Sequence, residues 1–233
     1  MSAALSARGL RKVYVGGDGR PIEVLASVDL DVAPGEFVAV VGESGSGKST
    51  LLHLLGALDA PTAGTIALQG RRYDALEPQE LAELRNRSIG FVFQFHHLLR
   101  DFTALENVML PLQIAGTAPA AARQRASQLL EAVGLSGRVT HLPSALSGGE
   151  QQRVAVARAL ATSPAVLLAD EPSGNLDRPT AERLHDLLAS VTREFGAALV
   201  CVTHNPLLAA RADRVLTVVD GRLAIPEGLV GLS

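Results

Sequence analysis

The chain has 233 residues, 47% of them hydrophobic and 19% charged, and this balance excludes a largely disordered protein. Its 21 basic and 24 acidic side chains give a net charge of −3, so no overall positive field would recruit nucleic acid or anionic lipid. The single cysteine, Cys201, excludes a disulfide framework, and no apolar run reaches the ~18 residues that a membrane-spanning helix needs.

These properties favour a soluble, cytoplasmic chain that reaches a membrane only through a partner. Nineteen of the basic residues are arginine. We interpret the scarcity of lysine, which occurs only as Lys12 and Lys48, as a codon bias.

The first third of the chain is typical of β-structure, because short β-branched runs alternate with turns that contain Gly or Pro. After a Gly-rich turn and an apolar helix, two more strands are expected before about residue 94, and helices dominate from about 100 to 160. Apolar strands then alternate with helices, which favours a parallel sheet covered on both faces and an α/β fold. The expected strands are Val13–Val15, Val24–Val32, Phe37–Val41, Thr65–Leu68, 88–93, Ala165–Ala169, Ala198–Val202 and Arg214–Val219.

The turn after the third strand has the pattern of a phosphate-binding loop, in the strand–turn–helix context that this loop requires. Its glycines let successive N–H groups converge on phosphate oxygens, and the following helix adds its positive N-terminal end. Lys48 is then expected to reach the β- and γ-phosphates, and the Ser49 hydroxyl to ligate Mg²⁺. A Gly/Ser turn that matches by chance is the weaker alternative. The predicted ATP-binding loop comprises Gly42, Glu43, Ser44, Gly45, Ser46, Gly47, Lys48, Ser49 and Thr50.

A second motif lies at the end of the apolar strand near residue 169, where Asp170 and Glu171 follow one another. Asp170 can hold the Mg²⁺ shell, and Glu171 can accept the proton of an attacking water. Alone, the pair could equally be two solvated acids at a strand end. Together with a phosphate-binding loop, it predicts nucleotide hydrolysis.

Between these motifs stands a third, Ser147, Gly148, Gly149 and Glu150, preceded by Leu146. It resembles the signature sequence of ABC-type ATPases. Ser147 can cap a helix, and that is one part of its expected role. The resemblance implies another: the serine and the N–H groups behind it complete the ATP pocket of a facing subunit. We therefore expect a two-fold homodimer that clamps two ATP molecules.

The resemblance extends over the whole chain and implies further roles. Tyr14 is similar to the aromatic residue that stacks on adenine, with a half-buried strand tyrosine as the alternative. Gln94 is similar to the glutamine that senses Mg²⁺ and links the site to the transport partner. Asp177 is similar to the aspartate that crosses the dimer interface, and His204 to the histidine that contacts the γ-phosphate, although a helix-capping histidine is an alternative.

The resemblance also implies the architecture: one ABC ATPase domain over residues 1–233, with a RecA-like parallel core sheet, an N-terminal antiparallel β subdomain and an inserted α-helical subdomain. Its catalytic core, with the β subdomain, would comprise 1–93 and 163–233. The helical subdomain, which carries the signature, would comprise 94–162.

Residues 93–99 and 101–108 resemble most closely the ATPases of bacterial lipoprotein-releasing systems. This implies a peripheral protein on the cytoplasmic face of the inner membrane, with membrane permease subunits docked near Gln94–Leu99 and lipoprotein as the indirect cargo. ATPases of macrolide-efflux or cell-division complexes share most of these motifs and remain alternatives. A soluble ABC ATPase acting on nucleic acid is disfavoured, because the chain has one cassette, no heptad run and no basic surplus.

Three positions depart from the family pattern: Arg100 stands in place of a usual proline, Asn205 in place of an aspartate, and Ser173 in place of a common threonine. None of these departures removes a predicted catalytic group. Arg100 leaves its loop less rigid than proline would. Asn205 directly follows His204, so it bears on how that histidine is tuned.

Overall fold

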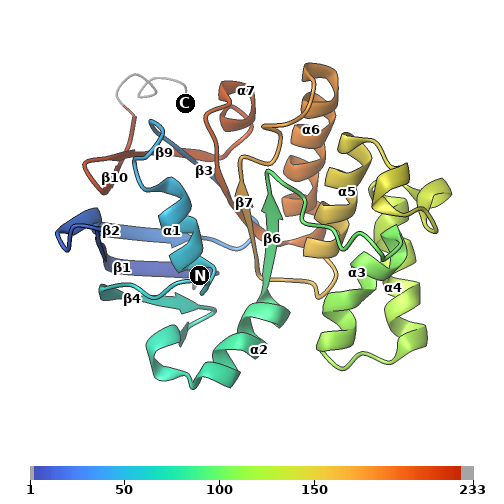
Figure 1. Ribbon diagram of the computed structural model, residues 1–233, viewed down its shortest axis with the longest axis horizontal. Coiled ribbons are helices and arrows are strands. Elements are labelled where there is room, and N and C mark those ends of the chain that lie inside the picture. The colour runs from blue at the N-terminus through green and yellow to red at the C-terminus, as the bar shows by residue number, and fades with distance from the viewer. Residues whose placement is uncertain (1–2, 227–233) are drawn as a thin grey trace.

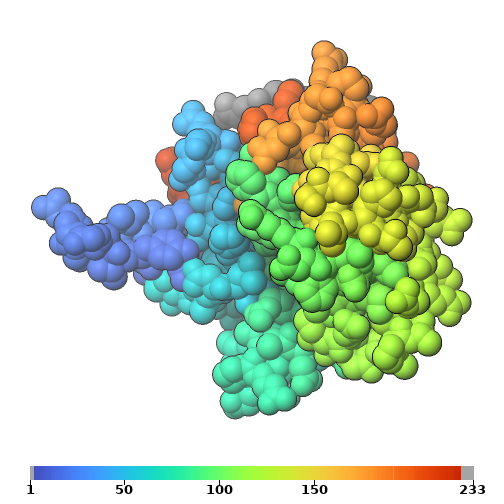
Figure 2. All heavy atoms as spheres, turned by 45° about the vertical axis from the view of Figure 1, so that its right-hand side comes forward, coloured from blue at the N-terminus to red at the C-terminus, as the bar shows by residue number. Residues whose placement is uncertain are grey.

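A computed structural model describes residues 3–226 of the protein. Its strands form two sheets (Figure 1), and the smaller one is antiparallel with the order β2-β1-β4-β5. The hairpin of β1 and β2 projects from the rest of the molecule (Figure 2). The strands of this sheet are β1 (Leu5–Val15), β2 (Pro21–Val32), β4 (Ala63–Leu68) and β5 (Arg71–Arg72).

The larger sheet has six strands in the order β10-β9-β3-β8-β7-β6. Its strands all run parallel except β10, which pairs antiparallel with β9 at one edge. This confirms the predicted α/β fold with a parallel core sheet. The strands are β3 (Phe37–Val41), β6 (Ile89–Phe93), β7 (Val166–Asp170), β8 (Ala198–Val202), β9 (Arg214–Val219) and β10 (Arg222–Ala224).

The central strands are apolar on both faces because each face supports its own core. Successive side chains of a strand point to opposite sides. Accordingly Ala39, Leu167 and Cys201 pack into a core shared with α3 to α6. Val40 and Leu168 join a second core, shared with α1 and the antiparallel sheet.

Seven α-helices connect these strands within the described residues (Figure 1). They are α1 (Lys48–Leu55), α2 (Pro78–Ser88), α3 (Ala104–Ile114), α4 (Pro119–Ala132), α5 (Gly148–Ala159), α6 (Arg178–Phe195) and α7 (Pro206–Ala209). Helices α3, α4 and α5 contact one another and lie together at one side of the core sheet. The division of the chain into a core and a helical subdomain at 94–162 remains a prediction. From residue 3 to residue 226, no helix combines the length and the apolar character needed to cross a bilayer.

The short strands β5 and β10 were not expected, and two longer elements also differ from the sequence-based expectation. Strand β1 is much longer than the predicted Val13–Val15. Its length was not recognisable because irregular pairing near Ala7, Leu10 and Lys12 interrupts the alternation of apolar and polar residues. Helix α2 was not expected, because only Leu84 of its residues is buried and no apolar stripe marks it. Proline in its first turn and an N-terminal hydrogen bond from Glu77 N–H to the Glu80 carboxylate, 2.9 Å, favour its start instead.

The C-terminal end of α5 presses directly on strand β6. A Cβ atom at Gly90 would lie only 2.3 Å from the carbonyl oxygen of Ala159, which is backbone and cannot rotate away. Only glycine therefore lets the helix approach the strand this closely. The contact fixes α5 relative to the strand that leads to Gln94.

We expect Gly90→Ala to lower the free energy of unfolding by about 1–3 kcal/mol, because the added methyl group overpacks the contact between α5 and β6. Gly137→Ala is the matched control, since among the described residues no atom would lie within 4 Å of its Cβ. Urea unfolding of both variants measures the difference. Equal stability of the two variants would contradict the close approach.

Candidate active site

The loop between β3 and α1 has a backbone that only glycine readily adopts. Gly42 and Gly47 have φ angles of +147° and +102°, and a Cβ at Gly47 would lie 3.0 Å from the Val24 carbonyl oxygen. Gly47 is also the N-cap of α1, so the free N–H groups of that helix open onto the loop. The loop thus has the geometry of an anion cradle.

Side chains of this loop carry polar groups suited to a phosphate. Lys48 is buried, and its Nζ donates to the carbonyl oxygens of Gly42 and Glu43, at 2.9 and 2.6 Å. The Ser46 hydroxyl is buried and finds no hydrogen-bond partner within residues 3–226. Unpaired buried hydroxyls are costly, so this one fits a site whose phosphate oxygens complete its hydrogen bonding.

A cavity of about 520 Å³ opens over the loop and extends to the carboxyl ends of β6, β7 and β8. Most of the residues predicted for nucleotide binding and hydrolysis meet here. The lining comprises Val24, Gly42, Ser44, Gly45, Gly47, Lys48, Ser49, Thr50, Gln94, Asp170, Glu171, Val202 and His204.

Asp170 ends strand β7 and lies beside Ser49 in the cavity lining. Burial raises the pKa of Asp170, a hydrogen bond with Ser49 opposes that rise, and the negative charge of Glu171 adds to it. A hydroxyl and a carboxylate are oxygen donors of the kind that Mg²⁺ prefers. Within the described ranges, no group of three or more His, Cys, Asp or Glu side chains could hold a metal by itself. A cation bound here would need further oxygen ligands, such as phosphate oxygens and water.

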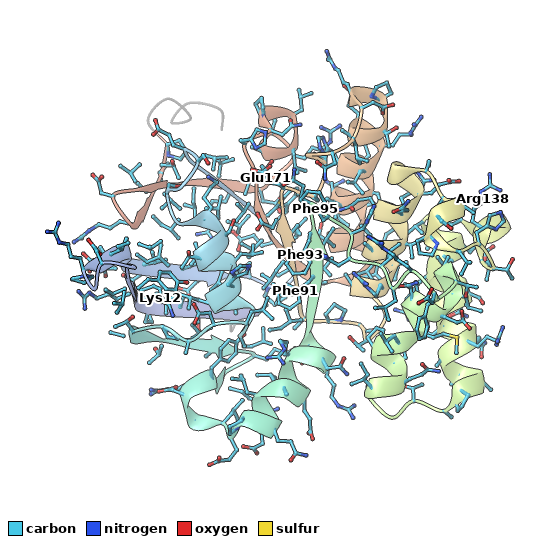
Figure 3. All side chains as sticks on the ribbon, viewed as in Figure 1. Lys12, Phe91, Phe93, Phe95, Arg138 and Glu171 are labelled. Carbon is cyan, nitrogen blue, oxygen red and sulfur yellow. The ribbon has the colours of Figure 1, made fainter. Side chains whose placement is uncertain are left out.

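Glu171 follows the last residue of β7 (Figure 3), and its backbone is strained while its carboxylate is firmly held. Its φ angle is +43°, a left-handed value that costs a non-glycine residue on the order of 1 kcal/mol. Its two carboxylate oxygens are hydrogen-bonded separately: Oε1 to Nδ1 of His204 at 2.7 Å, and Oε2 by the Thr203 hydroxyl at 3.1 Å. The carboxylate is therefore oriented from the end of the neighbouring strand β8.

Gln94 directly follows β6 and packs on the loop after Glu171. Its Nε2 donates to Oδ1 of Asn175 at 3.1 Å, and the Asn175 amide donates to the Gln94 carbonyl oxygen at 3.3 Å. A Cβ at Gly174 would lie 2.8 Å from the Gln94 amide nitrogen. Gln94 and the loop that leads to Asp177 are thus in direct contact.

The signature residues do not line the cavity of their own chain. Ser147 is the N-cap of α5: its hydroxyl accepts from Glu150 N–H at 3.3 Å, and its own N–H donates to the Glu150 carboxylate at 2.8 Å. These bonds, together with Arg138 at 2.9 Å, lower the pKa of Glu150 to about 2. A Cβ at Gly149 would lie 2.3 Å from the Thr180 methyl group, so the start of α5 is pressed against α6.

Asp177 and Tyr14 also lie outside the set of lining residues that the described chain provides. Asp177 caps α6 by accepting from Thr180 N–H at 2.9 Å. Tyr14 lies on β1 and donates its hydroxyl hydrogen to Asp59 at 2.8 Å. Both residues are predicted to lie at an ATP site, and within one chain neither completes the cavity.

Helix α5 also holds the backbone on both sides of Gln94. The buried amide of Gln152 donates to the Phe93 carbonyl oxygen at 2.9 Å. Arg158 donates to the carbonyl oxygens of His96 and His97, at 2.7 and 2.8 Å. These bonds leave the Phe95 side chain 63% exposed, beside a second cavity of about 860 Å³. This cavity is lined by Phe95, His96, His97, Leu98, Arg100, Asp101, Leu142, Pro143, Ser144 and Gln151.

The structure gives two of the departures from the family pattern a hydrogen-bonding role and adds one residue, Thr203, to the predicted site. Asn205 accepts from Leu207 N–H at 2.9 Å and so caps α7. Ser173 is hydrogen-bonded to the buried Nε2 of His185 at 2.8 Å, which ties its loop to α6. Thr203 was missed as a partner of Glu171, although its place before His204 at the end of β8 was a signal for it.

Comparison with known proteins gives one consistent result. The ABC transporter family matches residues 25–174. The chain is 57% identical over 220 residues to the lipoprotein-releasing system ATP-binding protein LolD of Bordetella pertussis, covering 94% of this chain and 95% of the relative. It is 54% identical over 223 residues to the protein of the same name from Geobacter metallireducens, covering 96% and 99%.

Solved structures agree. The dimeric structure of a bacterial ABC transporter cassette has a TM-score of 0.85 at 40% identity and covers 94% of this chain and 96% of its own. A dimeric cassette in a post-hydrolysis state, bound to ADP and phosphate, has a TM-score of 0.87 at 39% identity and covers 98% and 100%. This chain belongs to the ABC transporter family, as one of its ATP-hydrolysing cassettes.

Proposed function

We propose that the chain is the ATPase subunit of a lipoprotein-releasing ABC system, in which two copies bind ATP between them and drive membrane subunits. The observation that carries the hydrolytic part is the Glu171 carboxylate, held by His204 and Thr203 beside the phosphate-binding loop. Similarity to LolD along nearly the whole of both chains supports the lipoprotein part.

In this proposal the loop holds the triphosphate through its backbone N–H groups, and Lys48 exchanges its carbonyl partners for the β- and γ-phosphates. Mg²⁺, held through Ser49 and Asp170 with Gln94 nearby, would neutralise charge that develops on the transferred phosphoryl group. The donor set fits this ion because it supplies one or two oxygen ligands and leaves the rest to phosphate and water.

Glu171 acts as the general base. Its carboxylate accepts a proton from the water that attacks the γ-phosphorus; the bond from that phosphorus to the bridging oxygen breaks, and ADP and phosphate result. An ionised carboxylate only accepts hydrogen bonds, so Nδ1 of His204 is then the donor in their 2.7 Å contact. This fixes the ring and leaves Nε2 for the γ-phosphate.

Two copies are needed because the groups of the signature lie outside the cavity of their own chain. Ser147 and the first N–H groups of α5 form an anion site without a phosphate-binding loop beside it. In a two-fold dimer, this site would face the phosphates held by the other copy, and Asp177 would approach the same interface. ATP then joins the two copies, and hydrolysis releases them.

The membrane subunits would dock on the surface formed by Gln94–Leu99, where Phe95 is exposed beside the second cavity. The chain would work on the cytoplasmic face of the inner membrane. Closure of the dimer would pull on these subunits, which handle the lipoprotein cargo themselves. No direct contact of this chain with lipoprotein is required, and none with nucleic acid.

We expect Glu171→Gln to lower ATP turnover by at least about 100-fold, because the base is lost while the phosphate-binding loop is intact. ATP binding should persist, and with Mg²⁺ the variant should accumulate as a dimer. Phosphate release and sedimentation velocity measure these two effects. Glu131→Gln, an exposed carboxylate on α4, is the control. A monomeric E171Q variant at saturating ATP would contradict the ATP-joined dimer.

Mixing two inactive variants tests whether each pocket takes groups from both chains. Lys48→Ala removes the loop cation, and Ser147→Arg blocks the signature; each should be inactive alone. A mixed dimer contains one pocket with neither defect, so an equimolar mixture should recover up to about a quarter of wild-type turnover. If no activity returns while circular dichroism shows both variants folded, the pocket is complete within one chain.

The lipoprotein assignment predicts ATP-dependent release from a membrane. The chain should co-purify in detergent with its genomically adjacent membrane subunits. In proteoliposomes this complex should move an acylated lipoprotein into the soluble fraction in the presence of a lipoprotein-binding acceptor, and E171Q should abolish the release. If turnover is stimulated by a macrolide and no lipoprotein leaves, the complex is an efflux system instead.

A further inference from the structure

Lys12 is an exception in a chain that uses arginine for nearly every positive charge. Of 21 basic residues only two are lysine, and the other, Lys48, belongs to the phosphate-binding loop. Because nearly every other basic residue is arginine, a lysine at this position calls for a specific physical reason. Lys12 lies on β1 in the antiparallel sheet, in the half of the molecule away from α3–α5 (Figure 3). Its side chain is buried, with 9% of the residue exposed.

The Lys12 ammonium group has three close partners. Nζ lies 2.7 Å from Oδ1 of Asp59 and 2.7 Å from the Ala60 carbonyl oxygen, and it stands 4.8 Å from the centre of the Tyr14 ring. A compact ammonium can direct its donors to all three from one atom. Arginine spreads its donors over a larger planar guanidinium, so it cannot direct them from one atom, and this gives a physical reason for lysine here.

Asp59 joins Lys12 to Tyr14. While Oδ1 accepts from Lys12, Oδ2 accepts from the Tyr14 hydroxyl at 2.8 Å. Partial burial would raise the pKa of Asp59, but the hydrogen bonds from Lys12 and Tyr14 outweigh it and keep the carboxyl group ionised to lower pH. The tyrosine is thus fixed at its hydroxyl by Asp59 and on its ring by the cation.

This arrangement borders the nucleotide cavity. Tyr14 pairs with Ile22 across the hairpin, two residues before Val24, which lines the cavity. Thr50, another lining residue, lies close enough to the Tyr14 hydroxyl group to oppose the rise in its pKa that burial causes. Tyr14 is 38% exposed, so part of its ring remains accessible although Lys12 covers it on one side.

We propose that Lys12, fixed by Asp59, is a positioning residue that holds the Tyr14 ring ready to stack on the nucleotide base. A ring already held in one orientation loses less conformational freedom when a base packs on it, and this increases affinity. Lys12 therefore acts on recognition of the base and not on recognition of the phosphates. The inference rests on the base-stacking role that the family resemblance implies for Tyr14.

The test measures the affinity of the purified chain for two competitors of a fluorescent ATP analogue: Mg²⁺–ATP and Mg²⁺–tripolyphosphate, which has no base. Tyr14→Ala should weaken ATP about tenfold, the usual scale of base stacking on an aromatic ring. Lys12→Met should weaken ATP binding about 3- to 10-fold, and Lys12→Arg should not preserve the wild-type affinity. Neither change should alter tripolyphosphate affinity. In steady-state turnover, Lys12→Met should raise KM with little change in kcat.

Arg11→Met is the matched control, because Arg11 is the adjacent, more exposed cation of β1 and pairs with Glu23 at 2.6 Å. The variant K12M/Y14A tests the route: if Lys12 acts through the ring, the double variant binds ATP no more weakly than Y14A. Thermal unfolding of each variant records any loss of stability.

Three results would overturn the inference while the ATP site stands: K12M binds ATP like the wild type, it weakens tripolyphosphate equally, or its effect adds fully to that of Y14A. If Y14A itself binds ATP normally, the proposed stacking role of Tyr14 fails first, and the role of Lys12 fails with it. If the wild type does not bind tripolyphosphate, the proposed role of the phosphate-binding loop is contradicted instead.

Discussion

Parallel pairing of neighbouring strands is the constraint on which the candidate site depends. Strands β6, β7, β8 and β3 lie side by side with their carboxyl ends at one edge of the sheet. Each end supplies a different group: Gln94 after β6, Asp170 and Glu171 at β7, His204 after β8 and the phosphate-binding loop after β3. The apolar strands are thus the reason that residues more than 150 positions apart in the chain share one cavity. Ligand sites in open α/β sheets generally form at this edge.

Ser147 and Asp177, which lie outside the cavity, are positioned by helix ends and not by strand ends. Ser147 and Asp177 each cap a helix, α5 and α6, whose N-terminal ends lie close together, since Gly149 packs against Thr180. Capping serves the stability of the single chain, and it also exposes backbone N–H groups at a defined place. One residue can therefore meet a folding requirement and be available for a second copy. Neither Ser147 nor Asp177 therefore needs to line the cavity of its own chain.

A feature of the site could be predicted from the sequence when the residues that form it are close together in the chain. The loop 42–50 and the pair at 170–171 were recognisable because strand, turn and helix follow one another in the chain. The bond of Thr203 to Glu171 and that of Ser173 to His185 join separate elements, so the place of each residue in the sequence does not show which partner it contacts. Helix α2 lacks an apolar stripe, and bulges hide the length of β1. For Lys12, composition gave the first signal, but only the position of Asp59 gave it a physical meaning.

Hydrogen bonds from α5 to the backbone at the end of β6 and beyond it connect two distant parts of the molecule. Arg158 near one end of the helix holds two peptide carbonyls of the segment at His96 and His97, Gln152 holds Phe93, and Gly90 permits direct backbone contact. Ser147 stands at the opposite end, about 18 Å away for a helix of this length. A helix is stiff along its axis, so these contacts couple the position of the exposed segment near Phe95 to the position of Ser147 at the other end of α5.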